Sequence, residues 1–156
     1  MKIDELMIAL PYDNYGSTSR EEDIECFLQS ATTFCSFVAR GAEDYLELDE
    51  RIDIIAVYLE NSCSLDGSWK GAFCINIDIN FYFVDVDDLE DLIKTIGHEV
   101  RHAWQESNGW EFNYDLPHSE RPHEKDANEF QEEFLEHWLD KHGDNIMRVW
   151  TDQSLM

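Results

Sequence analysis

Two histidines spaced four residues apart, with a glutamate directly after the first, are the part of this sequence best suited to chemistry. They are His98, Glu99 and His102 in the segment GHEVRHAWQ. Because side chains four residues apart lie on one face of a helix, both imidazoles could reach the same ion. Neutral imidazole suits Zn²⁺, whose catalytic sites hold three protein ligands and leave one position for water. The spacing therefore predicts a zinc-bound water that gives its proton to Glu99 while it attacks a carbonyl.

A third ligand has to come from another element, and Glu124 is the candidate. In the predicted helix of residues 121–143, Glu124 lies one turn before Ala127 and close to the centre of the apolar stripe. A carboxylate that faces inward needs a cation or several donors, because burying it without a partner is costly. Two alternatives stay open: Glu124 could face solvent in the first turn of its helix, or it could pair with Arg101 or Arg121.

The segment between the two histidines and Glu124 holds further candidates. His118 and His123 could complete the ligand set in place of the carboxylate. A His₂Glu set is nevertheless preferred, because Gln105 and Asn108 occupy the positions where the longer three-histidine motif has glycine and histidine. Hydrolysis also needs a donor for the developing oxyanion, and His118 or Tyr114 is favoured for that role, with a surface role as the alternative for each.

Three segments have the apolar spacing and the end signals of helices, and two of them carry the candidate residues. They are residues 17–41, 85–109 and 121–143. Each ends at a glycine, the first of them at Gly41. The first segment also begins with a capping box, and the third has a proline near its start. Three amphipathic helices are therefore expected.

The candidate ligands lie on the polar side of the second predicted helix. Its apolar stripe consists of Leu89, Leu92, Ile93, Ile96, Val100, Ala103 and Trp104. His98 and His102 lie nearly opposite that stripe. Taken alone, this placement fits a solvated face, so a site requires a second, ligand-bearing element that covers these histidines.

Two segments between the first and second helices are rich in β-branched and aromatic residues. They are residues 51–61 and 72–84, and the turn residues of SLDGSWKG lie between them. This pattern predicts a β-hairpin. The order helix, strands, helix, loop, helix is typical of the α+β class. We therefore expect a small antiparallel sheet with helices packed on one face, in a single domain spanning residues 1–156.

The charge of the chain limits its partners. Lys and Arg number 11 against 35 Asp and Glu, which gives a formal net charge of −24. Such a chain repels phosphate backbones and anionic membranes, so direct nucleic-acid binding is excluded and a basic protein or peptide is the expected partner. No apolar run approaches the roughly 18 residues of a membrane span. The first residues lack signal-peptide features and the four cysteines form no C-x-x-C pair, which predicts a reducing, cytoplasmic location.

An acidic segment precedes the motif and could indicate a calcium site. It contains Asp85, Asp87, Asp88, Glu90 and Asp91. The twelve-residue calcium loop pattern is absent from it, and helix-forming residues follow directly. Stabilisation of a helix N-terminus by these carboxylates is the favoured interpretation.

GHEVRHAWQ followed by RPHEKDANEF resembles the zincin metallopeptidases of the gluzincin kind. The closest resemblance is to the short ImmA/IrrE-type domains, which are often carried by phages and mobile elements. In that family H-E-x-x-H provides two zinc ligands and the general base, and the first glutamate of a later E-x-x-A-N-x-F stretch provides the third ligand. The resemblance covers about residues 85–140 and implies that His98, His102 and Glu124 bind zinc and that Glu99 is the base.

The same resemblance implies a zincin-like fold and a way to hold the substrate. A small sheet would lie beside the helix of the motif, and its edge strand would hold an extended peptide by β-augmentation. In this sequence INIDINFYF would provide that edge. The family includes enzymes that cleave DNA-binding repressors, which agrees with an acidic protein that binds a basic target.

The sequence as a whole predicts a zinc-dependent metallopeptidase that hydrolyses a peptide bond in a protein substrate. The alternative is an acidic binding protein without catalysis, which imitates nucleic acid or inhibits a basic partner. A pseudo-peptidase, which binds metal but has lost turnover, lies between the two. If neither chelators nor a substitution of Glu99 changed the binding of a partner, the hypothesis of a non-catalytic binding protein would be favoured.

Overall fold

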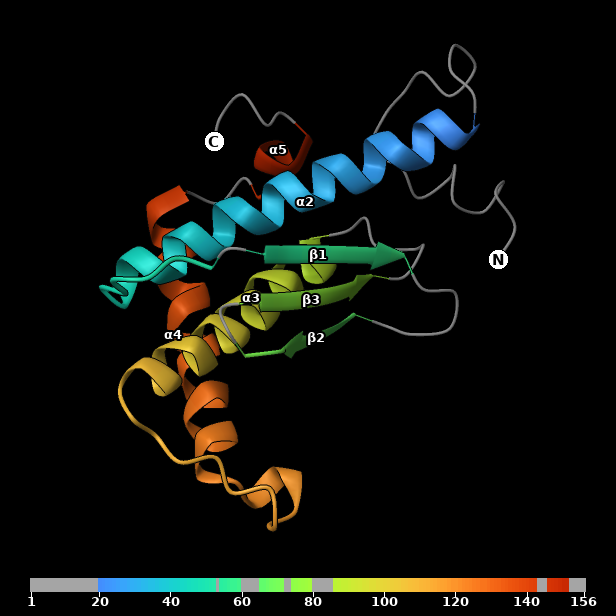
Figure 1. The fold of residues 1–156 in the computed structure, drawn as a ribbon. Helices are drawn as coiled ribbons and strands as arrows, with labels where there is room; N and C mark the ends of the chain where they lie inside the picture. The colour runs from blue at the N-terminus through green and yellow to red at the C-terminus, as the bar shows by residue number, and fades with distance from the viewer. Residues whose placement is uncertain are drawn as a thin grey trace.

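Helices make up most of the described residues, and a small sheet lies against them (Figure 1). The computed structural model describes residues 20–52, 54–59, 65–71, 74–79, 86–142 and 146–151. The elements are α2 (Arg20–Tyr45), β1 (Ile54–Leu59), β2 (Asp66–Trp69), β3 (Cys74–Ile79), α3 (Val86–Ser107), the 3₁₀ turn η1 (His118–Glu120), α4 (Pro122–His142) and α5 (Ile146–Thr151). The α+β class is thus confirmed.

The three predicted helices form. Local sequence signals explain where two of them, α3 and α4, begin or end. Asp87 and Asp88 lie in the first turn of α3, as expected for carboxylates near a helix N-terminus, while Asp85 lies outside the described residues. Beyond the last turn of α3, Gly109 adopts a φ of 75°, which is the left-handed conformation of a helix C-cap. Helix α4 begins at Pro122, where proline fits because the first helical N–H has no partner to lose.

The prediction that the first helix ends at Gly41 is wrong, because α2 continues to Tyr45. A Cβ on Gly41 would lie 3.6 Å from Cδ1 of Trp138, so this glycine faces the packed surface of α4. The backbone leaves the helical path only at Glu47, whose φ is 53°. The serine of the expected capping box, Ser19, lies outside the described residues.

The sheet is mixed, so the prediction of an antiparallel sheet is wrong. Its strand order is β1-β3-β2. Strands β1 and β3 run parallel, with Ile54 opposite Cys74, whereas β2 and β3 run antiparallel. The predicted hairpin between residues 51–61 and 72–84 is therefore absent. These segments provide the parallel pair, and the segment expected to be their turn contains β2.

The hairpin was predicted at the wrong place because the Asp-Gly pair that indicates a turn lies inside a strand. Gly67 pairs with Ile77 in the middle of β2. A Cβ on Gly67 would lie only 2.5 Å from Cγ2 of Thr95, so the glycine allows α3 to approach the strand closely. The true hairpin joins β2 to β3 and turns at Gly71, whose φ is 75° and whose carbonyl accepts a hydrogen bond from Cys74 N at 3.0 Å.

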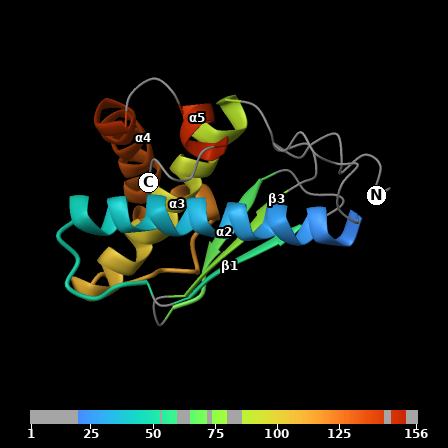
Figure 2. The same cartoon turned by 90° about the horizontal axis from the view of Figure 1, so that it is seen from above.

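One face of the sheet contributes to the core. Ile75, Ile77 and Ile79 alternate along β3 and are fully buried. Helix α2 packs on β1 and α3, and α3 packs on β2 and α4. Viewed from above, α3 and α4 lie together on one side of the strands, as expected for helices gathered on one face (Figure 2). The site residues of α3 are thereby enclosed between the sheet and α4.

Helices α3 and α4 approach each other closely at Gly97, the residue that precedes the first histidine of the motif. A Cβ at Gly97 would lie 2.6 Å from Cδ2 of the buried Phe134. The substitution Gly97→Ala is therefore expected to lower the free energy of unfolding by about 1–3 kcal/mol through overpacking. Urea denaturation measures the change.

Gly41 supplies the matched control for this prediction. Gly41→Ala also replaces a glycine inside a helix, but its Cβ would make ordinary van der Waals contacts. It should raise the free energy of unfolding by about 0.5–1 kcal/mol, because alanine loses less backbone entropy in a helix. Equal effects of the two substitutions would contradict the close approach at Gly97.

Two further expectations concern the cysteines and membranes. Cys26, Cys35 and Cys74 form no disulfide with one another, and Cys63 lies outside the described residues. Each of the described helices is too short or too polar to span a bilayer.

Candidate metal centre

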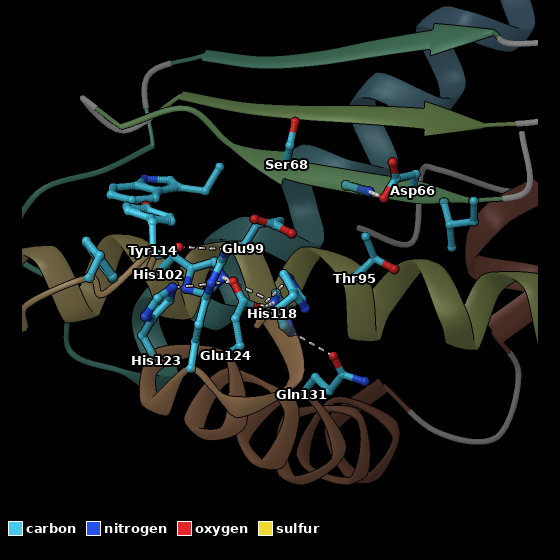
Figure 3. Close-up of a pocket in the computed structure, with 16 residues that line it drawn as sticks. Asp66, Ser68, Thr95, Glu99, His102, Tyr114, His118, His123, Glu124 and Gln131 are labelled. Carbon is cyan, nitrogen blue, oxygen red and sulfur yellow. Dashed lines mark hydrogen bonds and ion pairs between the residues drawn. The ribbon is translucent and has the colours of Figure 1, made fainter. Parts of the chain in front are cut away.

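The imidazoles of His98 and His102 meet the carboxylate of Glu124 (Figure 3). Nε2 of His98 lies 3.0 Å from Oε2 of Glu124, and Nε2 of His102 lies 3.2 Å from its Oε1. The two Nε2 atoms are 3.1 Å apart. Within the described residues, this is the group of histidine and acidic side chains whose potential ligand atoms come together, all within 4.8 Å of one another.

The polar face of α3 is covered, which is the condition that the sequence required for a site. His102 is 5% exposed and Glu124 8% exposed. The structure also decides between the alternatives for Glu124. Arg101 forms its ion pair with Asp126 at 2.7 Å, and Nε of Arg121 donates to the carbonyl of Leu116 at 3.0 Å. The ion pairs recorded for Glu124 are with histidines.

Both histidines present the same nitrogen to the carboxylate because their other ring nitrogen is held by an amide. Nδ1 of His98 lies 3.0 Å from Oε1 of Gln131, and Nδ1 of His102 lies 2.9 Å from Oε1 of Gln105. An amide oxygen accepts a hydrogen bond, so each Nδ1 donates to its amide and each Nε2 is the ring nitrogen that faces Glu124. Burial also lowers the pKa of His102, which favours the neutral form that ligates metals.

This donor set fits a divalent cation. Two neutral imidazoles and one carboxylate match the three protein ligands of a catalytic zinc site, and the amides that hold Nδ1 match its outer shell. A buried carboxylate gains a strong partner when a cation binds. Imidazole and carboxylate also suit other first-row ions, so the geometry by itself specifies a divalent metal.

Glu99 lies beside this group without joining it. It is 6% exposed and points toward β2 in Figure 3. Burial and the nearby charge of Glu124 raise the pKa of Glu99 to about 8, although a backbone hydrogen bond from Trp69 lowers it. At neutral pH and without a cation, Glu99 therefore holds a proton. A cation bound to Glu124 would offset the repulsion and favour the ionised form.

The three candidates from the connecting segment line the cleft beside this group. Nε2 of His118 is 3.4 Å from Oε2 of Glu124, and its side chain is 70% exposed. His123 is buried, and its Nε2 lies 3.7 Å from Oε1 of Glu124. Tyr114 is 62% exposed and lines the cleft. His118 and His123 are thus close to the site but stand outside the group of mutually close ligand atoms.

The group opens into a cleft of about 410 Å³ between β2, α3 and α4. The sequence did not predict several of the residues that line this cleft. Gly67 and Trp69 come from β2, which was expected to be a turn, and Phe112 comes from the segment that connects α3 to α4. The role of Gln105 had a local signal, because it stands three residues after His102 and shares its helix face. The others depend on chain segments that meet only in the tertiary structure.

Comparison with known proteins gives one match. Residues 68–142 match a protein family described as Protein of unknown function (DUF3920). No curated protein and no solved structure matches the chain. The matched region begins in β2 and ends at the last residue of α4, so it contains both histidines, Glu99 and Glu124. Because the description of this family names no activity, the function has to be argued from the site itself.

Proposed function

We propose that this protein is a zinc-dependent metallopeptidase that hydrolyses a peptide bond in a protein substrate. The observation that supports the proposal is the convergence of His98, His102 and Glu124, whose ligand atoms lie 3.0–3.2 Å apart. A buried glutamate, Glu99, stands at the same cleft. Two imidazoles, one carboxylate ligand and a nearby carboxyl for proton transfer are the parts that metal-assisted hydrolysis requires.

Each residue has a separate task in this proposal. The two histidines and Glu124 hold the zinc. When bound, zinc polarises a carbonyl and acidifies water, so a nucleophile is available near neutral pH. Glu99 accepts the proton of the attacking water and passes it to the leaving amine. His118 and Tyr114 are placed at the mouth of the cleft, where their polar hydrogens can reach the oxygen of a substrate carbonyl.

The proposed substrate is an extended peptide with basic character. Strand β2 is an edge strand of the described sheet and lines the cleft, so its free backbone side can pair with a peptide. This corrects the expectation that residues 75–83 provide the edge, because β3 is the central strand. The net charge of −24 attracts basic polypeptides at long range, most strongly at low salt.

Metal analysis combined with a peptide library tests the proposal. Untagged protein loaded with zinc and freed of excess ion should contain one zinc per chain. It should cleave members of a proteome-derived peptide library, detected by mass spectrometry, and the cleaved peptides should be enriched in Lys and Arg. Removal of zinc with a chelator should abolish cleavage, and added zinc should restore it. Protein that holds no zinc and cleaves nothing would leave an acidic binding protein as the better explanation.

A further inference from the structure

A chain of hydrogen-bonded polar side chains connects His102 to Asp126 of α4. Its first member, Gln105, is fully buried and lies one turn after His102 in α3. Its Oε1 lies 2.9 Å from Nδ1 of His102. Its Nε2 donates to the carbonyl of His123 at 2.9 Å and to Oδ2 of Asp126 at 2.8 Å.

These contacts determine which way the amide of Gln105 faces. Both of its hydrogens are used by acceptors on α4, so the oxygen has to face His102. An oxygen at that place accepts a hydrogen bond from Nδ1 and disfavours the tautomer with its proton on Nε2. If the acceptor at Asp126 is lost, the amide can rotate and offer its NH₂ group to Nδ1. The proton of His102 would then move to Nε2, the nitrogen that faces Glu124.

Asp126 is itself held firmly. Arg101 donates to it twice, from Nε to Oδ2 at 2.7 Å and from Nη2 to Oδ1 at 3.1 Å. The guanidinium lies 3.8 Å from the ring centroid of Trp104, which braces it from the other side. Together with the hydrogen bond from Gln105, these contacts fix the carboxylate of Asp126 in place.

We infer that Asp126 is a positioning residue for the metal centre, which acts through Gln105 to keep the Nε2 lone pair of His102 free for the cation. Arg101 completes this relay by fixing Asp126. The inference rests on the proposed function for the identity of the cation. The orientation of His102 that it asserts is a property of the protein without metal as well. In this relay a neutral amide stands between the carboxylate and the histidine, so the negative charge of Asp126 is kept one residue away from the centre.

The test is Asp126→Asn, an isosteric change whose NH₂ group can face Gln105. Zinc affinity is measured by competition with a fluorescent chelator, and the tautomer of His102 is read from its ¹⁵N shifts in zinc-free protein. The expected result is zinc binding weakened by about 10–100-fold, together with a shift of the His102 proton from Nδ1 toward Nε2. Asp140→Asn is the matched control, because Asp140 is an exposed residue of the same helix. It should change neither quantity.

The outcomes separate this inference from the proposed function. Unchanged affinity or an unchanged tautomer in Asp126→Asn overturns the relay, even if wild-type protein binds zinc and cleaves peptides. Wild-type protein that binds no zinc overturns the proposed function, and the tautomer in zinc-free protein still decides the relay. If circular dichroism shows that Asp126→Asn does not fold, Gln105→Met removes the same link. It is expected to give the same shift of the proton and the same weakening.

Discussion

Replacement of Glu99 with glutamine is expected to leave the protein folded and loaded with one zinc per chain while peptide hydrolysis falls by about 10³-fold. The metal should remain because Glu99 stands outside the group of ligand atoms. The fold should remain because a carboxyl with a pKa of about 8 is neutral at pH 7, and a neutral amide of the same size fits its buried position. Hydrolysis should fail because an amide does not accept the proton of the attacking water.

Zinc content by elemental analysis and initial rates on a cleaved library peptide measure the two effects. Glu106→Gln is the matched control, since Glu106 is an exposed residue of the same helix and lies outside the cleft. It makes the same chemical substitution on an exposed face of α3 and should retain the wild-type rate. If Glu99→Gln hydrolyses the peptide at the wild-type rate, Glu99 is not the base. If it loses zinc, the separation of binding from proton transfer is wrong.

Glu124→Gln is expected to weaken zinc binding by more than about 100-fold. Loss of an outer-shell partner alone costs 10–100-fold in typical sites, and here a ligand is removed. Two histidines remain, but the buried charge that balances the cation disappears. In the zinc-free protein the same change removes the carboxylate that four neighbouring imidazoles contact, so its effects on metal affinity and on stability need separate measurement.

Isothermal titration with zinc gives the affinity, and thermal unfolding of the zinc-free form gives the stability. Glu120→Gln serves as control, because Glu120 is exposed in η1 close to the cleft but has no part in the ligand group. Its zinc affinity should equal that of the wild type. Tight binding of one zinc by Glu124→Gln would show that the third ligand lies elsewhere, with His118 and His123 as the nearest candidates.

The two predictions address different parts of the site and together distinguish three kinds of protein. An active peptidase loses turnover in the first variant and metal in the second. A pseudo-peptidase loses metal in the second variant but has no turnover to lose. An acidic binding protein binds its basic partner equally in both variants, because the net charge of −24 changes little.

Several features of this protein follow from the sequence alone because they depend on neighbours along the chain. The spacing of His98 and His102 places both imidazoles on one face of a helix through the helical repeat itself. The ends of α3 and α4 follow from Gly109 and Pro122, whose backbone preferences act locally. The inward direction of Glu124 follows from its place in an apolar stripe of the same helix.

Other features depended on which segments pack together, and a local pattern carries no information on that. The strands of residues 54–59 and 74–79 read as a hairpin in sequence, yet they are parallel neighbours, because β2 occupies the edge beside α3. Gly67 was expected in a turn, whereas it lies in a strand and provides room for Thr95 of α3. Gly41 was expected to end a helix, whereas α2 continues past it to Tyr45.

The candidate centre shows the same division. Its histidines and its third ligand were recognisable, since each depends on the geometry of a single helix. Two other features could be recognised only in the tertiary structure. One is that α4 and the sheet cover the polar face of α3, and the other is the hydrogen bond from Gln105 to Asp126, 21 residues away. The rotation of α4 relative to α3 determines which of its polar groups face the histidines, and that rotation results from side-chain packing at contacts such as Gly97 with Phe134. Helical periodicity defines the face of each helix, but only packing determines what lies opposite it.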